Sequence, residues 1–279
     1  MRALGALSDW PVGTAAGGVL RREGAEGSPV TVVDEVGPRE RPFPWASVTK
    51  LCTTVAVLVA VEERSVSLDD LAGPSGSTLA HLLAHASGLG PRPGEVLAPP
   101  ARRRIYSSPG FEVAAQHLAA AVAMPFSDYL TEGVLHPLGM RGARLAAGTS
   151  PAAGMYGTLA DLLALGTELL RPTLIHGSTL HHATGVAFPG LSGVLPGFGP
   201  QLACDWGLGF EVKGVKSPHW TGRRNGPTTF GHFGQSGGFL WVDPVAGVAC
   251  AVLTDRLFGP WAQQAWPALA DDVLAELGR

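Results

Sequence analysis

Residues 45–51 read Trp-Ala-Ser-Val-Thr-Lys-Leu and open a long apolar run. Ser47 and Lys50 stand three residues apart. On a helix, side chains at this spacing share one face, with Cβ atoms roughly 5 to 6 Å apart, so the lysine amine can reach the serine hydroxyl. The spacing therefore indicates a serine that a neighbouring lysine can activate as a nucleophile.

Whether the Lys50 amine can accept a proton depends on the helix that follows it. The apolar residues of this helix leave no polar stripe, and such a helix is usually buried in a protein core. They are Val48, Leu51, Val55, Val57, Leu58, Val59 and Val61. Burial lowers the pKa of a lysine because it disfavours the charged ammonium. The alternative is that Ser47 only caps the helix while Lys50 extends to solvent.

Composition and charge narrow the range of partners. The 279 residues carry a formal net charge of −3 and 15% charged residues, with no basic stripe. This pattern disfavours nucleic acid and membranes as partners, and we expect a small-molecule ester, amide or peptide-like substrate. Cys52, Cys204 and Cys250 lie in apolar surroundings and are predicted to be buried thiols. With no signal peptide or membrane span recognisable, we expect a cytoplasmic protein, unless a leader precedes residue 1.

The two ends of the chain are rich in predicted strands. Short β-like runs at 18–20 and 30–33 predict a hairpin. Residues 206–212 predict another strand, and residues 238–242 and 248–253 predict a second hairpin. The chain closes on a helix whose apolar residues recur at helical spacing.

The middle of the chain, from about residue 51 to 170, has a helical pattern. Thr78 is predicted to start a helix that ends at residues 87–88, and Thr158 forms a capping box with Asp161. Between these ends and this middle, no repeat or flexible linker is evident.

We therefore expect an α+β fold, in which one antiparallel sheet flanked by terminal helices carries an inserted all-helical lobe. Residues 1–50 and 200–279 are expected to form the sheet lobe, and residues 51–199 the helical lobe. The two lobes are expected to act as one integrated catalytic unit, with a site in the cleft between them.

Two further stretches carry groups suited to proton transfer and binding. Tyr106 and Ser108 lie just before a predicted helix, where the phenol can relay a proton. Taken alone, Tyr106 is more simply a packed aromatic, and Ser108 is an N-cap followed by proline at the first helical position. In the glycine-rich residues 230–244, His232 can supply a proton or a hydrogen bond, and the N–H after Gly234 can face an oxyanion.

In type and order, the three stretches resemble the serine beta-lactamase and penicillin-binding-protein-like family, in particular its class C and esterase branch. That family carries Ser-x-x-Lys, then Tyr-x-Asn, then Lys-or-His-x-Gly. The resemblance covers roughly residues 15 to 275 and includes four more segments. They are His81–Leu89, His136–Met140, Met155–Asp161 and Trp206–Phe210.

The resemblance implies a serine hydrolase of the beta-lactamase/transpeptidase-like fold that needs no metal and no cofactor. Ser47 would be the acylated nucleophile, and Lys50 and Tyr106 would share the proton transfers. His232 would line the opposite wall, and the N–H groups of Ser47 and Gln235 would form the oxyanion hole.

Two positions depart from the family pattern. Ser108 replaces an asparagine that can bind an acyl side-chain carbonyl, and Phe233 replaces a hydroxyl residue beside the substrate carboxylate. Because His232 also replaces a lysine, carboxylate recognition is weakened. We therefore predict an esterase or amidase acting on a less anionic substrate. The alternatives are a true beta-lactamase or D-Ala-D-Ala carboxypeptidase, and a non-catalytic ligand-binding relative.

Two other patterns suggest different sites. Residues 234–238 fit G-x-S-x-G with Ser236 as the nucleophile, but that motif requires a following helix and a later histidine, and the sequence indicates neither. His81 and His85 have a spacing that can bind zinc. No third ligand is evident, so packing and C-cap roles are predicted for them.

Overall fold

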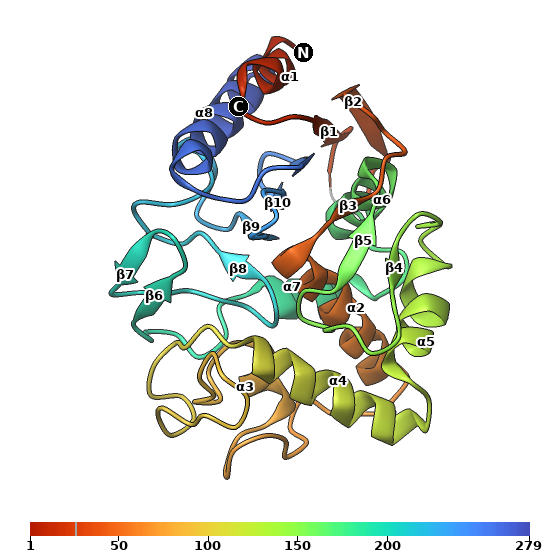
Figure 1. The fold of residues 1–279 in the computed structure, drawn as a ribbon, viewed down its shortest axis with the longest axis vertical. Helices are drawn as coiled ribbons and strands as arrows, with labels where there is room; N and C mark the ends of the chain where they lie inside the picture. Colours follow the sequence, from red (N-terminus) through yellow and green to blue (C-terminus); the bar gives the residue numbers. More distant parts are fainter. Residues whose placement is uncertain (26) are drawn as a thin grey trace.

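A six-stranded antiparallel sheet forms the centre of the protein, and its order is β2-β1-β11-β10-β9-β8 (Figure 1). The computed structural model describes residues 1–25 and 27–279. The strands are β1 (Ala15–Arg22), β2 (Val30–Val36), β8 (Glu211–Val212), β9 (Phe230–Phe233), β10 (Phe239–Asp243) and β11 (Val248–Thr254). Because β1 pairs with β11, both chain ends build one sheet, and the expected α+β fold is confirmed.

Helices cover both faces of this sheet (Figure 1). On one face lie α1 (Arg2–Gly5) and α8 (Pro260–Glu276), where Trp266 of α8 and Trp241 of β10 belong to one buried apolar cluster. Successive strand residues point to opposite faces. Leu240 accordingly faces α6 (Leu159–Leu170) on the other side, close to Gly166. Helix α6 lies in the range expected to form the helical lobe, yet it packs on the sheet.

Helix α2 is buried from Thr49 to Ala60, as its apolar sequence predicts, and α4, α5, η2 and η3 pack around it. The other helices are α2 (Thr49–Glu62), α3 (Leu79–Leu83), α4 (Ser108–Val122), α5 (Phe126–Leu130) and α7 (Gly177–Thr184), with the single turns η1 (Ala6–Asp9), η2 (Ala46–Val48) and η3 (Thr131–Leu135). Short strands are β3 (Phe43–Pro44), β4 (Arg144–Leu145), β5 (Met155–Gly157), β6 (Gly193–Leu195) and β7 (Gly199–Gln201). In the described part of the chain, no helix has the length and apolar character needed to cross a membrane.

The single strand expected for residues 206–212 is wrong for most of its length. Only the last two residues form β8, and Trp206 pairs with Glu211 across a turn. Gly209 makes the turn possible, because its φ is +79° and a Cβ there would lie 1.7 Å from Oγ1 of Thr54. A close approach to α2 therefore overrides the local strand pattern.

The helix that starts at Thr78 ends earlier than expected. It ends at Leu83 rather than at residues 87–88, because His85 adopts a left-handed φ of 54°. At the start of the helix, His81 Nδ1 accepts the N–H of Thr78 over 3.2 Å. His81 thus helps to cap the start of the helix, and the C-cap role expected for it is wrong.

We predict that Gly209→Ala lowers the free energy of unfolding by at least about 3 kcal/mol. The added methyl group would clash with Thr54, beyond the ~1–2 kcal/mol cost of a left-handed alanine. Gly139→Ala is the matched control, since Gly139 has a φ of +69° and open space around the added Cβ. Urea unfolding compares the two variants, and equal losses would contradict the clash.

Candidate active site

The hydroxyl of Ser47 is the centre of a small hydrogen-bond network at the start of α2. The O–H of Tyr106 donates to Ser47 Oγ over 2.8 Å, and Lys50 Nζ lies 3.3 Å from the same oxygen. Ser47 belongs to η2, Lys50 to the first turn of α2, and Tyr106 to the loop before α4. The structure thus brings the three residues expected to be catalytic together.

Lys50 is fully buried, and no carboxylate forms an ion pair with its amine within residues 1–25 and 27–279. The amine donates to the main-chain oxygen of Ala152 over 2.9 Å and to Ser108 Oγ over 3.1 Å. Burial lowers the pKa of Lys50 to about 7, although the negative charge of Glu112 opposes part of this shift. A neutral amine has two N–H groups for these acceptors and a lone pair that can face Ser47.

Ser108 differs from its expected position and contacts. The N-cap of α4 is Ser107, whose Oγ accepts the N–H of Gly110 over 3.1 Å, whereas Ser108 is already helical. The expected cap is therefore wrong by one residue. Ser108 Oγ faces Lys50 and does not line the pocket beside Ser47. In this structure Ser108 orients the amine, where the sequence suggested a contact with substrate.

His85 is a site residue that the sequence analysis missed. The N–H of Ser107 donates to His85 Nδ1 over 3.1 Å, and the N–H of Ile105 donates to the His85 carbonyl over 2.9 Å. The centroids of the His85 and Tyr106 rings are 4.6 Å apart. Both chain neighbours of Tyr106 are thus bound to His85, which fixes the phenol beside Ser47. The sequence signals for His85 were its spacing from His81, for which packing and C-cap roles were predicted, and its place in the family-like segment His81–Leu89.

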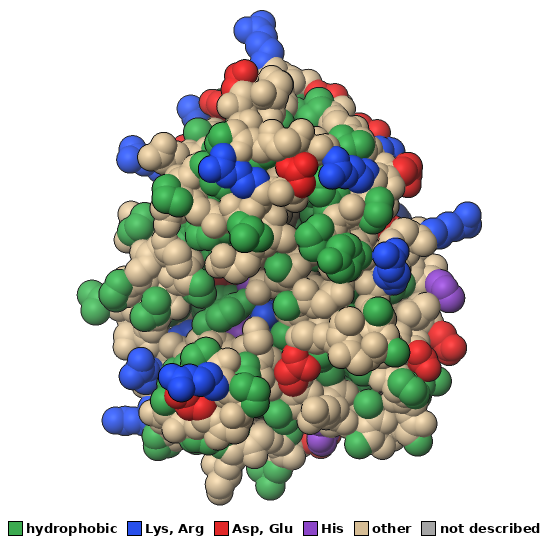
Figure 2. All heavy atoms as spheres, viewed as in Figure 1, with side chains coloured by type: hydrophobic (Ala, Val, Ile, Leu, Met, Phe, Trp, Pro, Cys, Tyr) green, Lys and Arg blue, Asp and Glu red, His purple; other side chains and the backbone are tan. Residues whose placement is uncertain are grey.

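A narrow pocket of about 40 Å³ opens beside Ser47. It is lined by Ser47, Tyr106, Leu195, Pro196, Trp206, Glu211, His232, Phe233 and Gln235. Figure 2 shows a hollow near the middle of this face, where histidine and Lys or Arg atoms are visible among hydrophobic side chains. Four of the residues expected to bind or activate substrate, Tyr106, His232, Phe233 and Gln235, therefore share one pocket with Ser47.

The end of β9 lies directly against the chain that precedes Ser47. A Cβ at Gly234 would lie 2.3 Å from the main-chain oxygen of Trp45, so glycine is needed for this approach. Ala46 adopts a left-handed φ of 45°, which is strained for a residue with a side chain. In the described part of the chain, the N–H groups of Ser47 and Gln235 donate to no protein acceptor. They remain available for the predicted oxyanion hole.

His232 is buried in the wall opposite Ser47, and one ring nitrogen is bound by the main chain. Nδ1 lies 2.7 Å from the carbonyl oxygen of Phe233. Because a carbonyl only accepts, Nδ1 carries the proton and Nε2 carries the lone pair. Burial and the positive charge of Lys50 lower the pKa of His232 to about 3, so the imidazole is neutral.

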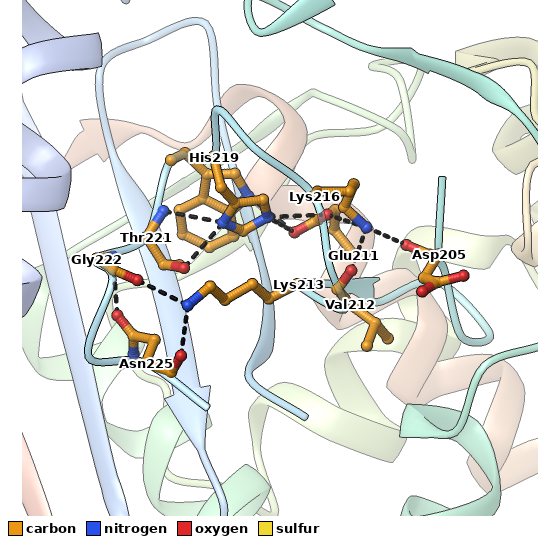
Figure 3. Close-up of polar contacts among 10 residues, drawn as sticks. Asp205, Glu211, Val212, Lys213, Lys216, His219, Thr221, Gly222 and Asn225 are labelled. Atoms are coloured by element: carbon orange, nitrogen blue, oxygen red, sulfur yellow. Dashed lines mark hydrogen bonds and ion pairs between the residues drawn. The ribbon is translucent and has the colours of Figure 1, made fainter. Parts of the chain in front are cut away.

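Glu211 lines the same pocket and is bound to the loop that follows β8 (Figure 3). Its carboxylate accepts from Lys216 Nζ over 2.7 Å, His219 Nε2 over 2.9 Å and Trp220 Nε1 over 2.8 Å. Burial raises the pKa of Glu211, but His219 and Lys216 outweigh it, and the pKa falls to about 2. The sequence pattern indicated only a strand at Glu211, although a lysine and a histidine follow within eight positions.

Comparison with known proteins identifies the family of the chain. The model of the Beta-lactamase family matches residues 6–275. The chain belongs to the Beta-lactamase family. The sequence is 49% identical to that of a beta-lactamase from Mycobacterium bovis with a known crystal structure. The two structures superpose with a TM-score of 0.94, and the match covers 99% of each chain. The resemblance drawn from the motifs is therefore confirmed. No curated protein matches the chain in sequence.

More distant structures share the fold of this Beta-lactamase family protein. An octameric penicillin-binding protein homologue from Pyrococcus abyssi is 17% identical, with a TM-score of 0.75, and the match covers 99% of this chain and 76% of that one. EstCE1, a hydrolase with promiscuous acyltransferase activity, is 18% identical, with a TM-score of 0.73 and coverage of 98% and 96%. The expected beta-lactamase/transpeptidase-like fold is confirmed.

We predict that the rate at which Ser47 reacts with a fluorophosphonate rises with pH through an apparent pKa near 7 and then levels off. Loss of the proton from Lys50 leaves the neutral amine that acts as the base, so the rate should fall about tenfold per pH unit on the acid side. Stopped-flow fluorescence with a labelled probe gives the profile.

Glu112→Gln is the control for this profile. Since the negative charge of Glu112 raises the pKa of Lys50, its removal should move the midpoint to lower pH and leave the shape unchanged. A wild-type midpoint near that of a solvated lysine, about 10.4, would show that the amine is not desolvated.

Proposed function

We propose that this protein is a serine hydrolase that forms an acyl-enzyme on Ser47 and acts on a small ester or amide. The observation that carries the proposal is the pair of contacts at Ser47 Oγ, 2.8 Å from Tyr106 OH and 3.3 Å from Lys50 Nζ, with the amine buried. A serine nucleophile needs a base that lies within hydrogen-bond reach and has lost its proton. The distance from Lys50 Nζ to Ser47 Oγ supports the first condition, and the burial of the amine supports the second.

In the proposed reaction, neutral Lys50 takes the proton of Ser47 as Oγ attacks the carbonyl carbon. The N–H groups of Ser47 and Gln235 stabilise the negative charge that develops on the carbonyl oxygen. Collapse of the tetrahedral intermediate breaks the bond to the alcohol or amine, which receives a proton through Tyr106. Burial raises the pKa of Tyr106, which supports a protonated relay rather than a phenolate base. Water, or another alcohol or amine, then takes the acyl group.

The pocket favours a short and weakly anionic substrate. Its volume of about 40 Å³ admits a small acyl group. Phe233 offers no hydroxyl to a carboxylate and packs with the rings of Trp220 and Phe258. These features support an esterase or amidase. A beta-lactamase is the second candidate, because the Mycobacterium bovis relative that is 49% identical is described as one.

We predict that kcat/KM on short p-nitrophenyl esters exceeds that on nitrocefin by at least about tenfold. The carboxylate of nitrocefin would lack the charged hydrogen bond that a lysine at His232 would give it, and such a bond contributes roughly 1.5–3 kcal/mol. Steady-state assays on the same enzyme preparation measure both constants. A preference for nitrocefin would favour the second candidate instead.

We predict that Ser47→Ala abolishes the covalent adduct that the wild-type protein gains from a fluorophosphonate or a fluorescent penicillin, because Ser47 is the acylated residue. Intact mass spectrometry detects the adduct. Ser236→Ala is the matched control and should keep it, since Ser236 is buried outside the pocket lining. A wild-type protein that forms no adduct would favour the non-catalytic relative, and loss in Ser236→Ala would favour the other nucleophile.

A further inference from the structure

His232 lines the pocket and carries a hydrogen-bond acceptor, the unprotonated ring nitrogen. Its Nδ1 proton is donated to the carbonyl of Phe233 over 2.7 Å, which leaves the lone pair on Nε2. Nε2 is buried, and it has no hydrogen-bond partner among residues 1–25 and 27–279. A buried polar atom without a partner is costly, so a ligand that supplies the missing donor gains this bond on binding.

The other side chains around the pocket do not favour an anionic ligand. Among the described residues that line it, Glu211 alone carries a charge, and that charge is negative. The amine of Lys50 contacts Ser47, Ser108 and a main-chain oxygen, and it lies outside the lining. The amine of Lys216 is paired with Glu211, and Lys216 lies outside the lining of this pocket. A carboxylate in this pocket would therefore meet the acceptor of His232 and no cationic side chain among the described lining residues.

We infer that His232 Nε2 selects substrates that carry a neutral hydrogen-bond donor, a hydroxyl or an amide N–H, close to the scissile carbonyl. The inference rests on the proposed function, because it names the substrate class of the same site. A lysine at this position donates hydrogen bonds and favours an anion. The neutral imidazole of His232 is held in one tautomer by the carbonyl of Phe233. Its Nε2 accepts a hydrogen bond, so it favours a neutral donor where a lysine would favour an anion.

The test compares the affinities of Ser47→Ala, which leaves esters intact, for matched ligands. One series is methyl butanoate, methyl 3-hydroxybutanoate and methyl 3-methoxybutanoate, and a second places hydroxyl or methoxy on the alcohol part of the ester. In at least one series, the hydroxyl member should bind about 3- to 10-fold more tightly than the methoxy member, as expected for one neutral hydrogen bond. Ligand-observed NMR titration gives the dissociation constants.

Variants of His232 assign the preference to Nε2. In the Ser47→Ala background, His232→Leu should abolish the preference, and His232→Gln should keep part of it, because the amide oxygen still accepts. His232→Lys only donates and should bind hydroxyl and methoxy members equally, which decides the matter if the leucine variant fails to fold. Equal binding in both series by the parent, no binding of any ester, or a preference that survives in the leucine and lysine variants overturns the inference.

Hydrolysis and binding measurements distinguish failure of the acyl-enzyme on Ser47 from failure of the role of His232. Wild-type protein is assayed for hydrolysis of the same esters. A hydroxyl preference in binding without any Ser47-dependent hydrolysis would overturn the acyl-enzyme proposal and support the role of His232. Hydrolysis with equal affinity for the hydroxyl and methoxy esters would support the hydrolase and overturn the role of His232.

Discussion

The chemistry proposed for this site depends on the burial of the Lys50 amine, which forms no ion pair with a carboxylate among the described residues. A pKa near 7 instead of 10.5 corresponds to about 5 kcal/mol of lost preference for the charged form, at ~1.4 kcal/mol per pKa unit. The apolar sides of α2 impose this cost, since they bury the helix from Thr49 to Ala60. A lysine on an exposed helix would stay protonated and could not take the proton of Ser47.

Burial alone does not place the groups that must meet. Ser47, Tyr106 and His232 come from three distant parts of the chain, and each position is fixed by backbone contacts rather than by side-chain packing alone. The loop of Tyr106 is bound to His85 on both sides of the phenol. The end of β9 reaches the segment of Ser47 because Gly234 has no side chain to meet the Trp45 carbonyl. The pocket is thus held from two directions around the nucleophile.

Sequence patterns predicted those features that depend on neighbours in the chain. The buried helix α2, the hairpin of β10 and β11, and the capping box at Thr158 follow from spacing and turn residues alone. The turn at Gly209 could not be predicted, because it depends on a close contact with Thr54 of α2. The strand pattern of residues 206–212 gives no indication of that contact. Local pattern fails where a distant element decides the backbone.

The same limit applied within the site. The motifs located Ser47, Lys50, Tyr106 and His232, because these residue types in this order resemble a known family. The roles of Ser108 and His85 depend on which atoms face one another after folding, and Ser108 turned out to contact the amine of Lys50. A shift of one residue in a helix cap was enough to redirect this side chain.

Glu211 is a buried carboxylate that lines the pocket beside Ser47, and it is paired with groups other than Lys50. Both of its oxygens are occupied by Lys216, His219 and Trp220, which come from the loop after β8. A carboxylate with an oxygen left over would attract the ammonium form of Lys50 and raise its pKa, as Glu112 does in part. The protein thus contains two buried lysines with opposite environments. Lys216 pairs with the carboxylate of Glu211, whereas the amine of Lys50 contacts the hydroxyls of Ser47 and Ser108 and the main-chain oxygen of Ala152.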